Sequence, residues 1–130
     1  MTTRRTVALL WTLQVVLALV FLAHGLLLLF PPADIAQQMS AVFPRSFWVF
    51  LGVAEILAAV GLTIPGLTGI YPWLVSWAAI GLMIVMVAAT VYHVRRGEIS
   101  SAVVTLVLLV MATVVARARL STATLIRSSS

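Results

Sequence analysis

The stretch from Thr6 to Phe30 reads TVALLWTLQVVLALVFLAHGLLLLF, and its only ionisable side chain is one histidine. An α-helix needs about 20 apolar residues to cross the hydrocarbon core of a bilayer, and this stretch is long enough to do so. In lipid the backbone N–H and C=O groups must find partners within the segment, which a helix provides and an open strand does not. The stretch therefore predicts a transmembrane helix.

Three further apolar stretches follow the first, at about residues 46–64, 72–93 and 99–116. Residues that end helices stand at the breaks, such as Pro31 and Pro32 after the first stretch and Pro65 and Gly66 after the second. We therefore expect an all-α fold, a four-helix transmembrane bundle. It forms a single membrane domain over residues 1–130, and residues 117–130 are expected to be a polar tail.

The composition indicates that the outer surface of the protein contacts a lipid bilayer. Of the 130 residues, 63% are hydrophobic and 8% are charged, whereas a soluble domain usually carries about 25% charged residues. The net charge of +5 does not indicate nucleic-acid binding, because its arginines lie at the edges of apolar runs, where they anchor helices to headgroups. The chain has no cysteine, so any electrons must be carried by a bound cofactor or substrate.

A secretory signal peptide is the alternative interpretation of the first stretch. Arg4 and Arg5 would be its basic start, and Ala23 and Gly25 would form a small-x-small cleavage site. The apolar run is longer than that of a signal peptide and continues to Phe30 beyond this site. We therefore interpret it as a membrane span.

The connection over residues 31–45 is the longest and the only one of mixed polarity. Ile35, Met39 and Val42 recur at helical spacing, and Asp34 is suited to cap a helix. We expect a short helix here that lies in the membrane interface.

Three short motifs follow one another: a Gly-x-x-Glu-Ile pattern, a Gly-Leu-x-x-Pro helix exit and a His-x-x-x-Gly-Glu ending. They are formed by Gly52, Glu55 and Ile56, by Gly61, Leu62 and Pro65, and by His93, Gly97 and Glu98. In this order, and with VFLAHGLLLLF in the first helix, they resemble the DoxX-like family of small bacterial membrane proteins. The resemblance implies a four-helix membrane protein and, from some relatives, a link to oxidoreductase systems and quinone chemistry. It supplies no established catalytic residue.

The chain departs from the family pattern in the first helix. The family often has a small residue before the glycine of this helix and a lysine shortly after it. Here His24 precedes Gly25, and Leu28 stands at the lysine position. A function that needs the lysine is not supported, whereas His24 becomes a candidate functional residue.

Glu55 is the strongest functional signal, because an ionised carboxylate at the centre of a membrane helix costs at least about 2.5 kcal/mol. Gly52, Ala58 and Ala59 lie three or four residues away from it, and small residues let a second helix approach. Glu55 should therefore face the bundle. Two roles stay open for it: a hydrogen-bonded packing residue, and an acid/base group.

Glu55, His24 and His93 are the candidate catalytic residues, and the candidate substrate-binding residues are Gln14, Arg95, Arg96 and Glu98. Hydrogen bonding between helices is the simpler role for Gln14, and headgroup anchoring is the simpler role for the arginine pair. Alternating helix directions place His24, Glu55 and the His93 region in one half of the membrane. We expect a polar cleft between the first three helices, open toward the first and third loops, with Glu55 at its floor. No residue spacing supports a metal site.

Three functions are compatible with these residues. The first is a membrane subunit or enzyme acting with a lipophilic redox molecule such as a quinone, the cofactor suggested by the resemblance, together with an oxidoreductase partner. The second is a cofactor-free isomerase or cyclase that uses Glu55 on a hydrophobic substrate. The third is a non-catalytic partner of another membrane protein. The sequence does not decide whether the chain is an enzyme, and a homo-oligomer stays open.

The arginines predict the orientation in the cell membrane. Five fall on the side of the termini and three on the other side: Arg4, Arg5, Arg117, Arg119 and Arg127 against Arg45, Arg95 and Arg96. Because positive charge is enriched in cytoplasmic loops, both termini should be cytoplasmic. A reporter that works only in the cytoplasm should be active when fused after Ser130. Activity of a periplasmic reporter there would reverse the orientation, and opposite sides for the two termini would exclude four spans.

Overall fold

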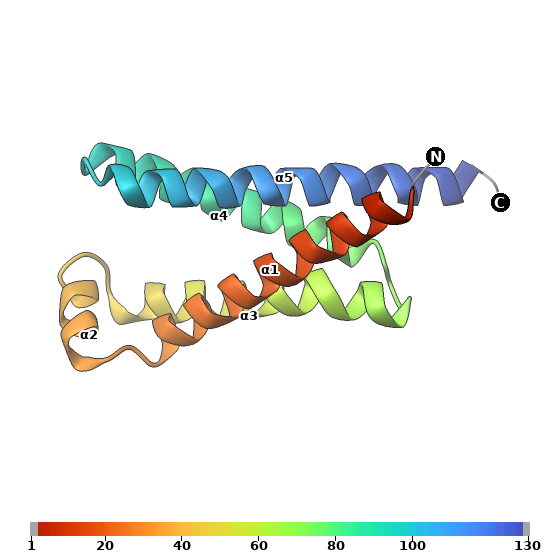
Figure 1. Cartoon of the computed structure of the whole chain (residues 1–130). Helices are drawn as coiled ribbons and strands as arrows, with labels where there is room; N and C mark the ends of the chain where they lie inside the picture. Colours follow the sequence, from red (N-terminus) through yellow and green to blue (C-terminus); the bar gives the residue numbers. More distant parts are fainter. Residues whose placement is uncertain (1–2, 129–130) are drawn as a thin grey trace.

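The computed structural model describes residues 3–128, with side chains as far as residue 122. Within this range the chain is all-helical (Figure 1), with α1 (Arg4–Leu29), α2 (Ala33–Ser40), α3 (Arg45–Thr68), α4 (Leu74–Arg95) and α5 (Ile99–Ser128). The four long helices are each long and apolar enough to cross a membrane. The predicted all-α fold with four membrane-spanning helices is therefore confirmed.

The long helices form two closely packed antiparallel pairs, α1 with α3 and α4 with α5. Contacts between α3 and α4 join the pairs, and α1 also meets α5 over a shorter region. The helix α2 and the turn between α4 and α5 lie at one end of the molecule, and both chain ends lie at the other (Figure 1). The first and third loops thus share one side, as alternating helix directions predict.

The second span does not end at Pro65, where the sequence predicted its end near residue 64. Pro65 lies inside α3, which continues to Thr68 and is closed by Gly69 in the left-handed region at φ +70°. The N–H of Gly69 donates to the carbonyl of Pro65 at 3.0 Å. A proline removes one backbone donor, and a membrane helix tolerates this where neighbouring groups satisfy the freed backbone. The carbonyl that loses its helical donor to Pro65 is that of Gly61, four residues earlier. The carbonyl of the next residue, Leu62, accepts a hydrogen bond from Gln14 Nε2 at 2.7 Å.

The last helix also runs further than predicted. Residues 117–128 were expected to belong to a polar tail, but α5 continues without a break to Ser128. This segment contains neither proline nor glycine, so no residue in it ends a helix. Its Arg119 side chain packs back on the bundle, as described below.

A short helix does form after the first span, as expected for residues 31–45. It begins at Ala33 with Pro32 at the N-cap, and Asp34 lies in its first turn and is not the capping residue predicted from the sequence. An acidic side chain there still interacts favourably with the helix dipole. Trp48 on α3 donates its Nε1–H to the carbonyl of Met39 at 2.9 Å, which ties α2 to the bundle.

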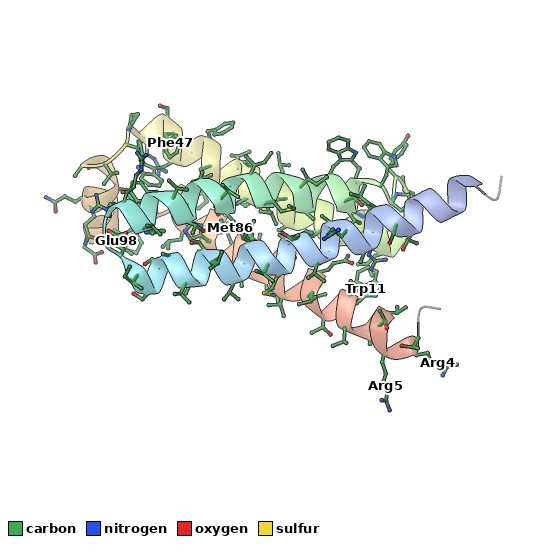
Figure 2. The ribbon with its side chains drawn as sticks, turned by 90° about the horizontal axis from the view of Figure 1, so that it is seen from above. Arg4, Arg5, Trp11, Phe47, Met86 and Glu98 are labelled. Carbon is green, nitrogen blue, oxygen red and sulfur yellow. The ribbon has the colours of Figure 1, made fainter. Side chains whose placement is uncertain are left out.

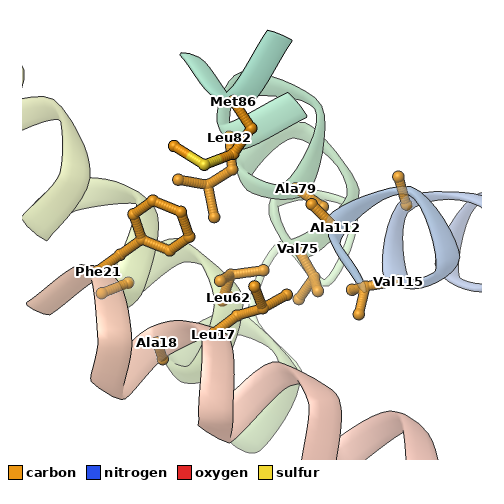
Figure 3. Packing of buried hydrophobic residues seen from close by; sticks show 12 residues of the cluster. Leu17, Ala18, Phe21, Leu62, Val75, Ala79, Leu82, Met86, Ala112 and Val115 are labelled. Atoms are coloured by element: carbon orange, nitrogen blue, oxygen red, sulfur yellow. The ribbon is translucent and has the colours of Figure 1, made fainter. Parts of the chain in front are cut away.

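All four spans contribute to one apolar core (Figure 3). Leu17 and Phe21 of α1 and Leu62 of α3 meet the buried face of α4, and α5 adds small side chains between them. The residues of α5 in this core are Ala112, Val115 and Ala116. Such small residues bring membrane helices close together, which strengthens their van der Waals packing.

The closest approach between α1 and α3 is at Gly25 and Gly52. A Cβ atom built on Gly52 would lie 2.9 Å from the carbonyl oxygen of Gly25, and one built on Gly25 would lie 2.8 Å from the carbonyl oxygen of Gly52. Since backbone atoms cannot move aside as a flexible side chain does, both positions require glycine. The prediction that Gly52 and Ala59 face a neighbouring helix is confirmed, because both are buried.

We expect Gly52→Leu to force α1 and α3 apart and to lower stability by about 1–3 kcal/mol, the usual cost of overpacking. The measurement is the midpoint of thermal unfolding in detergent. Leu57→Phe is the control, because Leu57 is 65% exposed on the outer surface of the same helix. Equal shifts for the two variants would mean that the close contact of α1 and α3 is wrong.

Candidate functional site

Glu55 lies on the buried face of α3 that also carries Gly52, Ala59 and Leu62. Its side chain is 1% exposed, and its Oε2 is 2.6 Å from Nδ1 of His24 on α1. The small residues three and four positions from Glu55 predicted that its side chain faces the bundle. The structure shows that this face contacts a neighbouring helix. Of the predicted residues, the structure brings His24 and Glu55 together.

The contact between the two glycines explains how this pair forms. His24 directly precedes Gly25, and Glu55 lies one helical turn after Gly52. Because the helix backbones touch at these glycines, the longer side chains beside them can reach across the α1–α3 interface. The His24 side chain is 49% exposed on the outer surface of the bundle, whereas the carboxyl group is enclosed. The pair thus connects the surface of the protein with its interior.

The pairing offsets the cost of burying a carboxyl group in a membrane helix. With one proton shared between ring and carboxyl, the pair is either imidazolium and carboxylate or imidazole and carboxylic acid, and its net charge is zero in both forms. A neutral hydrogen-bonded pair avoids most of the desolvation penalty of an isolated ion. The proton can move between the two partners without leaving an unpaired charge, which is the property required of an acid/base group.

Glu55 also lines an apolar groove of about 500 Å³ between α3 and α4. Small residues create its space, because they leave room where larger side chains would fill the contact between the helices: Ala54, Ala58 and Gly61 on α3, and Ala78 and Gly81 on α4. A Cβ atom on Gly81 would have no neighbour within 4 Å.

This groove differs from the polar cleft that the sequence predicted around Glu55. It lies between the second and third spans, its walls are apolar, and it extends to Pro65 and Leu74 at the end of the bundle near the second loop. The reason is that the glycine contact closes α1 against α3, while the small side chains that line the groove leave space between α3 and α4 unfilled. Trp77, at the rim, is 61% exposed.

Gln14 lies elsewhere, in a second polar contact nearer the chain ends. It is fully buried, its Nε2 donates to the carbonyl of Leu62, and its Oε1 accepts from Nε of Arg119 at 2.7 Å. Both ends of the amide are therefore engaged within the protein. The guanidinium of Arg119 also lies 5.3 Å from the centre of the Trp11 ring.

The remaining candidates gather in the turn between α4 and α5. His93 Nδ1 is 2.6 Å from Oε2 of Glu98, and Arg96 donates its Nε–H to Oε1 of Glu98 at 2.7 Å. These hydrogen bonds, first that of Arg96 and then that of His93, lower the pKa of the Glu98 carboxyl. Arg95 is exposed on the same turn.

This turn is separate from the groove. Val85 lines the groove beside Glu55, and His93 follows eight residues later, roughly 12 Å further along the helix axis. In residues 3–122 no three histidine, aspartate or glutamate side chains come together as a metal site requires. The structure therefore pairs His24 with Glu55 and leaves His93, Arg96 and Glu98 as a surface cluster.

Two arginines have structural roles that sequence reasoning missed. Arg45, at the start of α3, donates to the carbonyls of Leu28 at 2.7 Å and of Leu29, the unpaired carbonyls at the end of α1. Arg119 continues the buried stripe of α5, because it follows Val115 and Ala116 at helical spacing. That spacing could have predicted that Arg119 packs against the bundle. The sequence offers no comparable indication for Arg45.

Comparison with known proteins identifies a family for this fold and site. A model of the DoxX-like family matches residues 12–115, which include the second and third spans, the larger part of the first and fourth, and both His24 and Glu55. No curated protein and no solved structure matches the chain. The match covers most of the chain, and the motifs from Gly52 to Glu98 lie within the matched residues. The chain therefore belongs to the DoxX-like family of membrane proteins.

Proposed function

We propose that this protein binds a lipophilic redox molecule of the quinone class in the groove between α3 and α4 and exchanges a proton with it through Glu55 and His24. One observation carries the proposal. A buried carboxyl group that is hydrogen-bonded to a histidine also lines an apolar groove inside a membrane protein. An apolar cavity with few polar groups is the usual form of a site for a hydrophobic ligand.

The shape of the groove supports a ligand that enters from the bilayer. Its walls are formed by the facing sides of two membrane spans, and its polar lining is nearly confined to Glu55. A quinone has an apolar tail that fits such walls and carbonyl oxygens that need a hydrogen-bond donor. Glu55 in its protonated form is such a donor.

The pair is suited to the proton transfer that quinone reduction needs. A quinone takes up two electrons and two protons to become a quinol, and Glu55 can deliver one proton to a carbonyl oxygen. Delivery of this proton leaves a neutral imidazole and a carboxylate. Because His24 is half exposed and hydrogen-bonded to Glu55, a proton that its ring takes up from outside the protein can pass to the carboxylate and supply the second proton. The electrons must come from an oxidoreductase partner, because the chain has no cysteine to supply them.

A cofactor-free isomerase or cyclase is the second candidate. The observation that favours it is the same pair, since a coupled acid and base can move a proton on a hydrophobic substrate without any electron transfer. The two functions differ in whether the groove binds a quinone, which makes quinone binding the deciding measurement.

We expect Gly81→Leu to fill the groove and to weaken binding of a short-chain quinone analogue at least about tenfold, because a Leu side chain occupies ligand space. The structure offers open space for a Cβ atom at Gly81, so the fold should be retained. Binding can be followed by the quenching of Trp77 fluorescence at the rim of the groove, with Trp77→Phe identifying its signal.

The matched control is Val107→Leu, because Val107 lies 52% exposed on α5, away from the groove. This variant should bind the quinone analogue as the wild type does. Wild-type protein that binds no quinone, or Gly81→Leu protein that binds it with unchanged affinity, would contradict the proposed site.

Glu55→Gln separates binding from chemistry. The amide preserves the shape and a hydrogen bond to His24 but cannot pass on a carboxyl proton. The variant should therefore remain folded and bind the quinone, while membranes containing it should reduce added quinone no faster than membranes without the protein. Full activity of this variant would show that Glu55 only holds the helices together.

A further inference from the structure

Arg119 is a membrane-embedded cation whose hydrogen-bonding capacity is only partly used. Its guanidinium has five N–H groups; Nε donates to Gln14, and Nη2 is buried without a hydrogen-bond partner among the described residues. The face of the group lies 5.3 Å from the Trp11 ring centre, a cation–π contact that fixes its orientation. The side chain is only partly buried, so one side of it is open to the surroundings.

No acidic side chain in the described residues pairs with this cation. It has three acidic side chains, Asp34, Glu55 and Glu98. Glu55 is bonded to His24, and Glu98 is bonded to His93 and Arg96 in the turn at the opposite end of the bundle. Asp34 is in α2, which also lies at that opposite end (Figure 1). In the described part of the chain Arg119 is therefore held by an amide and an aromatic ring and lacks a counter-ion.

The position of Arg119 along the bundle matches the level of lipid headgroups. The Trp11 ring lies against Gly66, where a Cβ atom would be 3.0 Å from Cη2 of the ring, and Gly66 is two residues from the end of α3. Figure 2 shows Trp11 beside α5 on the end that carries Arg4 and Arg5. The guanidinium thus lies within about one helical turn of the hydrocarbon boundary, where tryptophan side chains are also enriched.

We propose that Arg119, held by Gln14 and Trp11 between α1 and α5, binds the phosphate of an anionic membrane phospholipid. A guanidinium donates charge-assisted hydrogen bonds to phosphate oxygens, and Nη1 of Arg119 remains for such a bond, because Nε donates to Gln14 and Nη2 is buried. A zwitterionic headgroup brings its own cation and neutralises Arg119 less well. The site is independent of the groove between α3 and α4, and its occupant fixes α1 against α5 at the end where these helices meet.

The test is native mass spectrometry of the full-length protein in a neutral detergent. Phosphatidylglycerol and phosphatidylcholine with identical acyl chains compete for the protein. We expect the wild type to prefer phosphatidylglycerol about fivefold, the effect of one arginine near an anionic lipid headgroup. Arg119→Gln should abolish the preference, whereas Arg117→Gln should retain it, because Arg117 is exposed. If both variants lost the preference for phosphatidylglycerol equally, the preference would come from the overall positive charge of the surface, and the proposed site would be wrong.

A second variant keeps the test decisive if Arg119→Gln does not fold. Gln14→Glu places a carboxylate on the atom that already accepts from Arg119 Nε, so the cation gains an internal counter-ion. The lipid preference should then disappear, and its survival would overturn the proposal. Inorganic phosphate should not displace the lipid from the wild type; displacement would mean that the site takes a free anion.

Discussion

A carboxyl group inside a membrane bundle is stable only if another group holds its proton or its charge, and in this protein that group is His24. The hydrogen bond between Glu55 and His24 forms where α1 and α3 lie closer than ordinary side chains allow. Gly25 and Gly52 provide this approach, because each places its carbonyl oxygen where the other would carry a Cβ atom. The two glycines thus bring α1 and α3 into contact, and the hydrogen-bonded pair of His24 and Glu55 makes this contact specific.

Arg45 and Gln14 make further polar contacts that involve α1. Arg45 donates to the last carbonyls of α1, and Gln14 joins the Leu62 carbonyl to Arg119. These bonds all involve α1, so the polar contacts concentrate on the side of α3 that faces this helix. The opposite side of α3, toward α4, is left with small apolar residues and the groove. Glu55 lies where the two sides meet, and for this reason it is the centre of the proposed chemistry.

The sequence predicted the features that depend on one segment at a time. The lengths of the apolar stretches predicted the four spans. The small residues around Glu55 predicted that its side chain faces the bundle. The end of α3 was predicted too early, because the helix continues through Pro65 and ends only at Gly69, whose left-handed backbone closes it. A polar cleft was expected between the first three helices, whereas the groove is apolar and lies between α3 and α4 alone, since side-chain volumes between these two helices decide where space is left. The width of the groove could not be derived from the sequence pattern of either helix alone.

The central claim is that His24 and Glu55 interact directly across the contact of α1 and α3. A double-mutant cycle with His24→Leu, Glu55→Leu and the combined variant measures this interaction through the free energy of unfolding in detergent. We predict a coupling energy of about 1 kcal/mol, in the range found for hydrogen bonds between membrane helices. Additive effects of the two substitutions, with no coupling, would contradict the pairing and with it the proposed site.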